Sequence, residues 1–161
     1  MSVYDLVLRG GVVLLSELNK EEKLNIGISQ RKIAALSADE MEGREVIDAS
    51  GSYVSPGFID SHMHDEEKED GDTIEKALLR QGVTTAIAGN CGSGPLGDEI
   101  LPFRREPWIN LGYLTGHKKL REAAGAVDRY LPATKAQIEI MRSLLRKELE
   151  NGSFGLSIGL E

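Results

Sequence analysis

The feature that most constrains the fold is the alternation of two hydrophobic patterns after Pro56. Short apolar or β-branched stretches, typical of strands, are separated by longer segments whose apolar residues recur every three or four positions. We predict strands over residues 58–64, 83–88, 108–114 and 154–158, and helices over residues 73–81 and 133–150. Alternating strands and helices indicate parallel strands joined by helical crossovers, so residues 56–161 are expected to form an α/β unit.

Capping signals support both predicted helices. Asp72 is placed as the N-cap of the first helix, and Gly82 as its C-terminal glycine. Thr134 is placed to cap the second helix, and Asn151-Gly152 to end it.

Residues 1–55 show a different pattern, dominated by short strand-like segments. The first, Tyr4 to Leu15, is rich in strand-forming residues, with Gly10-Gly11 predicted as a break or bulge. The other expected segments are residues 24–28, 33–36, 45–47 and 52–54, with a turn at residues 29–32. We therefore predict a small β-sandwich-type domain, incomplete within this stretch.

The charge and cysteine content narrow the class of protein. A net charge of −7 disfavours nucleic acid and anionic membranes, because both attract basic patches. No apolar run approaches the roughly 20 residues of a membrane helix, and the N-terminus lacks the order of a signal peptide. A single cysteine, Cys91, cannot form an internal disulfide. We expect a cytoplasmic globular protein that binds neither nucleic acid nor membrane.

Two of the three histidines lie two positions apart, in the stretch GFIDSHMHD at residues 57–65. Residues two apart in a strand point to the same face, so Asp60, His62 and His64 are predicted to share one side. They lie at the C-terminal end of a predicted strand. Parallel α/β sheets and barrels place their active sites at that end.

A cysteine, Cys91, closes the next predicted strand. Neighbouring strands lie roughly 4.8 Å apart, so this thiol could meet His62 and His64 around one cation. Imidazole and thiolate together suit zinc better than magnesium or calcium. The alternative is a chance pair of exposed histidines beside a cysteine that acts only as a small apolar side chain.

Four segments, taken together, resemble the amidohydrolase superfamily and, within it, the D-aminoacylase (N-acyl-D-amino-acid deacylase) group. They are residues 56–64 (PGFIDSHMH), 82–92 (GVTTAIAGNCG), 116–121 (GHKKLR) and 155–160 (GLSIGL). The first marks the superfamily, and the Gly-Asn-Cys-Gly element at 89–92 points to the deacylase group.

The resemblance implies a small β domain followed by a TIM-like (β/α)8 barrel that hydrolyses N-acyl-D-amino acids. It also implies that His62 and His64 hold one metal position and that Cys91 is a ligand in place of a carboxylated lysine. One or two divalent ions, zinc above all, would polarise the amide carbonyl and activate a water. An aspartate from the last barrel strand would move the proton.

A complete barrel takes about 250 residues, so we expect residues 56–161 to supply only about its first half. The remaining metal ligands and the general base are expected downstream, and no catalytic residue is assigned within the chain. The metal is expected to be weakly held or absent in the isolated chain, which should self-associate or contact the missing C-terminal half. His117 is interpreted as a pocket-wall or hydrogen-bonding residue, Arg121 matches the family pattern without an assigned role, and Glu161 is a weak ligand candidate.

Two other interpretations of the function stay open. One is a cyclic amidase of the dihydroorotase or hydantoinase kind, although such enzymes prefer a carboxylated lysine where Cys91 stands. The other is a non-catalytic fold fragment or split-enzyme subunit that keeps the ligands without turnover.

Overall fold

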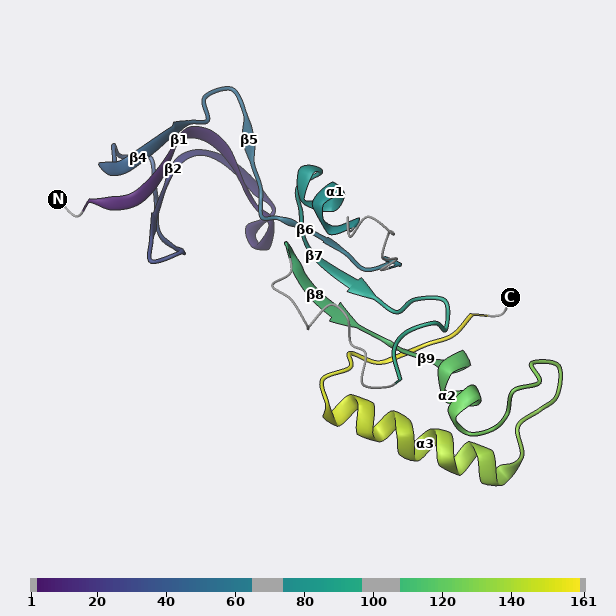
Figure 1. Cartoon of the computed structure of the whole chain (residues 1–161). Helices are drawn as coiled ribbons and strands as arrows, with labels where there is room; N and C mark the ends of the chain where they lie inside the picture. Colours follow the sequence, from purple (N-terminus) through teal and green to yellow (C-terminus); the bar gives the residue numbers. More distant parts are fainter. Residues whose placement is uncertain (1–2, 65–73, 97–107, 160–161) are drawn as a thin grey trace. The chain divides into compact units, whose positions relative to one another are not determined.

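The computed structural model describes residues 3–64, 74–96 and 108–159 (Figure 1). The chain divides into two compact units, Met1–Pro56 and Gly57–Glu161.

The first unit is a sheet of five strands, in which β1 pairs with β2, β4 and β5, and β3 pairs with β2. β1 runs antiparallel to β2 and parallel to β4 and β5, and β2 runs antiparallel to β3. The elements are β1 (Tyr4–Leu15), a short 3-10 turn η1 (Ser16–Leu18), β2 (Lys20–Ser29), β3 (Lys32–Ser37), β4 (Gly43–Asp48) and β5 (Tyr53–Val54).

Two irregularities of this sheet were predicted and are confirmed. The register of β1 against β2 shifts between Leu8 and Gly11, and Gly10 takes a φ of +71°, which glycine tolerates without strain. At the hairpin tip, Gln30 and Arg31 both have positive φ, at +50° and +62°. That is the backbone of the tight turns that join antiparallel strands with the correct twist.

The second unit contains short parallel strands in chain order, with α1 between β6 and β7 and with α2 and α3 between β9 and β10. β6, β7 and β8 form one parallel sheet, and β9 pairs in parallel with β10. The elements are β6 (Phe58–Asp60), α1 (Ile74–Arg80), β7 (Val83–Ala88), β8 (Asn110–Tyr113), β9 (Thr115–Gly116), α2 (His117–Ala123), α3 (Lys135–Glu150) and β10 (Leu156–Ser157). The predicted parallel α/β arrangement is confirmed.

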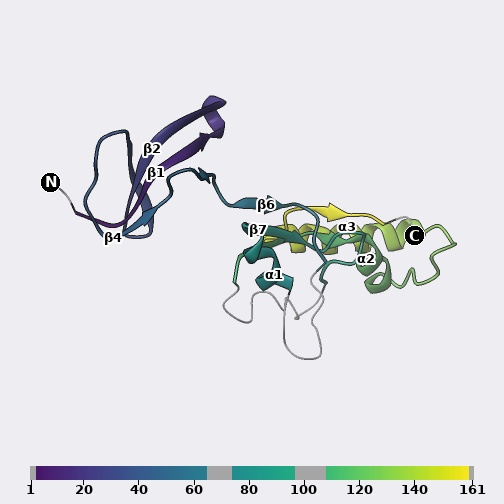
Figure 2. The ribbon, with the colours of Figure 1, turned by 90° about the horizontal axis from the view of Figure 1, so that it is seen from above.

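A small apolar core lies between the sheet and α1. Met63, Ala86, Ala88 and Ile109 are buried together, and Leu78 of α1 packs against them. On the other side of the fold, α2 and α3 lie side by side in both views of the ribbon (Figure 2). None of the described helices is long and apolar enough to span a bilayer.

Three predicted strands are too long. The strand predicted over residues 58–64 ends at Asp60, because the Asp60 carboxylate accepts the backbone N–H of His62 (3.0 Å) and so turns the chain locally. The strand predicted over residues 108–114 is reduced to β8, and β9, which follows a break at Leu114, lies beyond the predicted range. The strand predicted over residues 154–158 is reduced to β10.

The helix predictions are confirmed in part. Thr134 caps α3 as predicted, and Gly82, at a φ of +83°, follows α1. Asp72, the predicted N-cap of α1, lies outside the described residues. Helix α2 was not predicted, because its seven residues bury only Leu120 and so carry no periodic pattern.

Candidate metal centre

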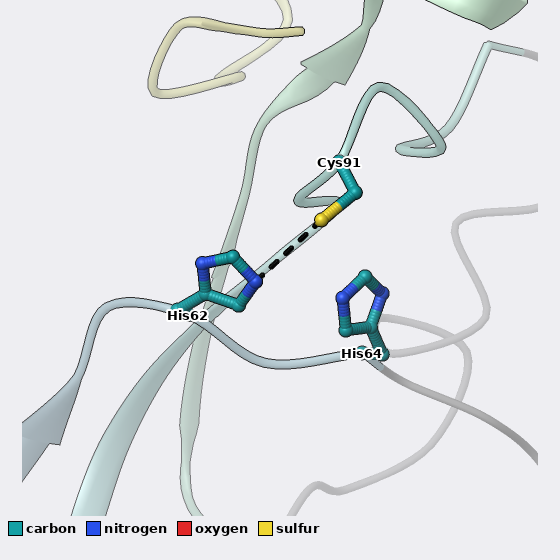
Figure 3. A group of neighbouring side chains, drawn as sticks. All are labelled: His62, His64 and Cys91. Atoms are coloured by element: carbon teal, nitrogen blue, oxygen red, sulfur yellow. Dashed lines mark hydrogen bonds between the residues drawn. The ribbon is translucent and has the colours of Figure 1, made fainter. Parts of the chain in front are cut away.

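Three side chains converge just beyond the ends of β6 and β7. One ligand atom from each of His62, His64 and Cys91 lies within 4.8 Å of the other two (Figure 3). His62 Nε2 lies 3.6 Å from Cys91 Sγ, and the two imidazole ring centroids are 5.4 Å apart at an angle of 63°. All three residues are exposed, so a cation could reach them from solvent.

The two histidines point the same way although they lie beyond the strand. Met63, between them, is only 3% exposed and packs into the core, and its backbone N–H donates to the carbonyl oxygen of Ile87 (3.1 Å). The period of two therefore continues past the last ladder bond of β6. One buried apolar side chain thus aims both imidazoles outward.

Cys91 occupies a turn with an unusual backbone. Its φ is +54°, and the flanking Gly89 and Gly92 have φ values of +82° and +75°. A non-glycine residue in this region costs roughly 1–2 kcal/mol, so such residues persist where surrounding structure holds them. Gly94 and Gly116 border the turn so closely that a Cβ on either would overlap the carbonyl oxygen of Leu114 or Gly92.

The sulfur–nitrogen distance fits a zinc ion. With a Zn–S bond of about 2.3 Å and a Zn–N bond of about 2.05 Å, tetrahedral geometry separates sulfur and nitrogen by about 3.6 Å. His62 Nε2 and Cys91 Sγ lie 3.6 Å apart. A donor set of two imidazoles and a thiolate also binds zinc better than it binds hard cations such as magnesium or calcium.

The donor cluster opens onto a cleft of about 780 Å³. His64 and Cys91 belong to its wall, and His117, read from the sequence as a pocket-wall residue, also lines it. The remaining lining residues are Ser93, Lys118, Arg121, Glu122, Ala126, Val127, Arg129, Tyr130 and Gly159. Three of these are cationic and one is acidic, although the whole chain has a net charge of −7.

Arg121 has a role that the sequence did not reveal. Its Nη2 donates to the carbonyl oxygens of Asp128 (2.8 Å) and Leu131 (2.9 Å) and thereby holds the loop after α2. That loop supplies Arg129 and Tyr130 to the cleft, with the Arg129 guanidinium 5.0 Å from the Tyr130 ring centroid. Glu161, the weak ligand candidate, lies outside the described residues.

Comparison with known proteins identifies the family. Residues 45–156 match the model of the Amidohydrolase family. The chain belongs to this family. Among curated amidohydrolases, D-aminoacylase from Alcaligenes xylosoxydans xylosoxydans is 30% identical over 97% of the chain. N-acyl-D-glutamate deacylase from the same organism is 33% identical over 97% of the chain.

A solved amidohydrolase structure matches the fold. N-acyl-D-glutamate deacylase from Bordetella bronchiseptica, complexed with zinc and a phosphonate mimic of the tetrahedral intermediate, superposes with a TM-score of 0.82 at 30% identity. The match covers 99% of this chain and 39% of that one. The chain likewise spans 38% and 37% of the length of the two curated relatives. The family resemblance and the α/β fold class predicted from the sequence are therefore confirmed.

Proposed function

We propose that the chain carries the first part of a zinc-dependent amide hydrolase that removes the acyl group from N-acyl-D-amino acids. The observation that supports this most directly is the convergence of His62, His64 and Cys91, in which the His62 Nε2–Cys91 Sγ distance suits a shared zinc ion. Membership of the amidohydrolase family gives the reaction type, and the names of its relatives suggest the substrate class.

In this proposal residues 1–55 are the beginning of a small β-sandwich-type domain and residues 56–161 are the first half of a (β/α)8 barrel. The second unit has parallel strands in chain order, as a barrel requires. The chain also covers less than two fifths of a deacylase to which it is closely similar in fold.

The three donors would hold the ion, and the ion would polarise the amide carbonyl and lower the pKa of a bound water. The cleft beside them would hold the rest of the substrate. An N-acyl amino acid carries a carboxylate, and the cations of Lys118 and Arg129 line the cleft that contains His64 and Cys91. The proton would be moved by an aspartate from the later part of the barrel, as the resemblance implies.

A cyclic amidase is a weaker candidate. L-Hydantoinase from Arthrobacter aurescens superposes with a TM-score of 0.60 at 18% identity, which supports a shared fold alone. A thiol at Cys91, where such enzymes prefer a carboxylated lysine, favours the acyclic substrate. The thiol also suits the reducing cytoplasmic location predicted from the sequence.

The test is hydrolysis of N-acetyl-D-amino acids, followed as released amino acid with and without zinc. The intact enzyme should turn over the D substrates when zinc is supplied. The 161-residue chain alone should show no turnover above background, because about half a barrel leaves metal ligands and the general base unsupplied. Zinc-dependent turnover by the purified chain, confirmed by mass, would contradict this second expectation and favour a self-sufficient site.

A further inference from the structure

The turn that carries Cys91 is held by a residue far away in the sequence. Ser157 of β10 is 7% exposed, and its hydroxyl donates to the carbonyl oxygen of Gly89 (2.5 Å). The Ser157 hydroxyl oxygen in turn accepts the backbone N–H of Gly92 (3.1 Å). The Ser157 hydroxyl therefore donates one hydrogen bond and accepts another, and its two partners are the residues on either side of the Asn90-Cys91 pair.

The backbone around Cys91 also fits closely against β10. A Cβ on Gly159, two residues beyond Ser157, would overlap the carbonyl oxygen of Cys91. Two residues of one short segment thus restrict where the turn can lie. Ser157 bonds to it, and Gly159 leaves room for it.

A second clamp joins the turn to the histidine segment. Asn90 is 7% exposed, and its Nδ2 donates to the carbonyl oxygens of Ile87 (2.9 Å) and Met63 (3.4 Å). Met63 lies between the two histidines. The thiol of Cys91 and the imidazoles of His62 and His64 are therefore fixed to one another through the backbone as well as through packing.

We infer that Ser157 is a positioning residue for the metal centre: its hydroxyl locks the Cys91 turn so that the thiol faces His62. The Ser157 hydroxyl bonds to Gly89 and Gly92, so its effect on the metal centre passes through the Cys91 turn. The turn needs such support because Cys91 has a positive φ that its own side chain disfavours. The part of this inference that concerns metal rests on the proposed function, whereas the part that concerns the turn does not.

The test compares Ser157→Ala with the matched control Ser153→Ala in the 161-residue chain. Ser153 is a second serine at 7% exposure in the same segment, but its hydroxyl bonds to Thr115 Oγ1 (2.8 Å) and Gly155 O (3.1 Å), away from the Cys91 turn. Amide hydrogen exchange followed by NMR should show the Gly92 N–H exchanging about tenfold faster in Ser157→Ala and unchanged in Ser153→Ala. Unchanged Gly92 exchange in Ser157→Ala, or equal acceleration in the control, would overturn the inference.

Cobalt(II) titration of the intact enzyme, followed by calorimetry so that the variant without the Cys91 thiol can be measured as well, supplies the second arm. Loss of a residue that orients a ligand typically weakens metal affinity by about 10–100-fold, so Ser157→Ala should fall in this range and Ser153→Ala should not. Where Cys91→Ala weakens cobalt binding but Ser157→Ala does not, the positioning role is overturned and the proposed metal centre stands. Where faster Gly92 exchange in Ser157→Ala is found but Cys91→Ala leaves cobalt binding unchanged, the clamp stands and the metal centre is wrong.

Discussion

At the scale of single residues, Cys91 carries both a donor side chain and an unfavourable backbone conformation. Glycine adopts its φ of +54° without the clash that a Cβ suffers. We therefore expect Cys91→Gly to be more stable to urea than Cys91→Ala by about 1 kcal/mol, while both lose the thiol. Equal unfolding midpoints would mean that the turn relaxes in the alanine variant and that the positive φ is not imposed by its surroundings.

The ligand assignment makes a separate prediction. In the intact enzyme, Cys91→Ala and His62→Asn should lower the metal content and abolish hydrolysis, while the cooperative unfolding transition is retained. Metal stoichiometry by atomic emission is measured beside turnover. His117→Asn is the control for metal content, since His117 lines the same cleft but is not in the donor cluster. Full zinc content and full activity in Cys91→Ala would contradict the ligand assignment and mean that the cysteine acts only as a small apolar side chain.

At the scale of elements, a capping box holds the N-terminus of helix α3. Thr134 Oγ1 accepts the Gln137 backbone N–H (3.3 Å), and Gln137 Oε1 accepts the Thr134 N–H (2.9 Å). Loss of such a cap costs about 1 kcal/mol, so Thr134→Ala should lower the free energy of unfolding by that amount. Thr134→Ser keeps the hydroxyl and should stay near the wild type. A similar loss in both variants would show that the threonine methyl group matters and the cap does not.

The last turn of α3 makes stability depend on pH. Partial burial raises the pKa of Glu148 above its ordinary value, with Lys147 opposing the shift. A raised pKa means that the protonated form favours the folded state, so this contribution is lost as pH rises through the folded pKa. Glu148→Gln should therefore be more stable than the wild type at pH 7, and the gain should vanish below the ordinary glutamate range. Glu150→Gln, an exposed glutamate in the same turn, is the control for the helix dipole.

The elements also show which signals a sequence carries. Helix α3 was predictable because a cap, a periodic apolar face and a terminal glycine agree along one segment. The shared direction of His62 and His64 was predictable because a period of two needs only local backbone. The end of β6 was not, since the bond from His62 N–H to Asp60 competes with the ladder. The bonds from Ser157 to Gly89 and Gly92 depend on packing across 68 and 65 residues, which no local pattern encodes.

At the scale of the whole molecule, the second unit exposes large apolar side chains on β6 and beside β10. Phe58, Ile59, Phe154 and Ile158 are all more than half exposed, with Ile59 at 71%. Large exposed apolar surface marks an interaction site, and these four side chains are candidates for one. We expect the 161-residue chain to self-associate at micromolar concentration in light scattering, and Ile59→Lys to reduce the apparent mass. A compact monomer with a cooperative melt would contradict the expectation.

The donors lie close together along the chain, and this affects the order in which the site forms during folding. His62, His64 and Cys91 fall within 30 positions, whereas the clamp from Ser157 arrives 66 positions after the cysteine. Closing a short loop costs less conformational entropy and is faster than closing a long one. The donors should therefore meet early, on a loose turn, and gain a fixed geometry only when β10 docks. During synthesis, an ion captured early would exchange freely until β10 leaves the ribosome.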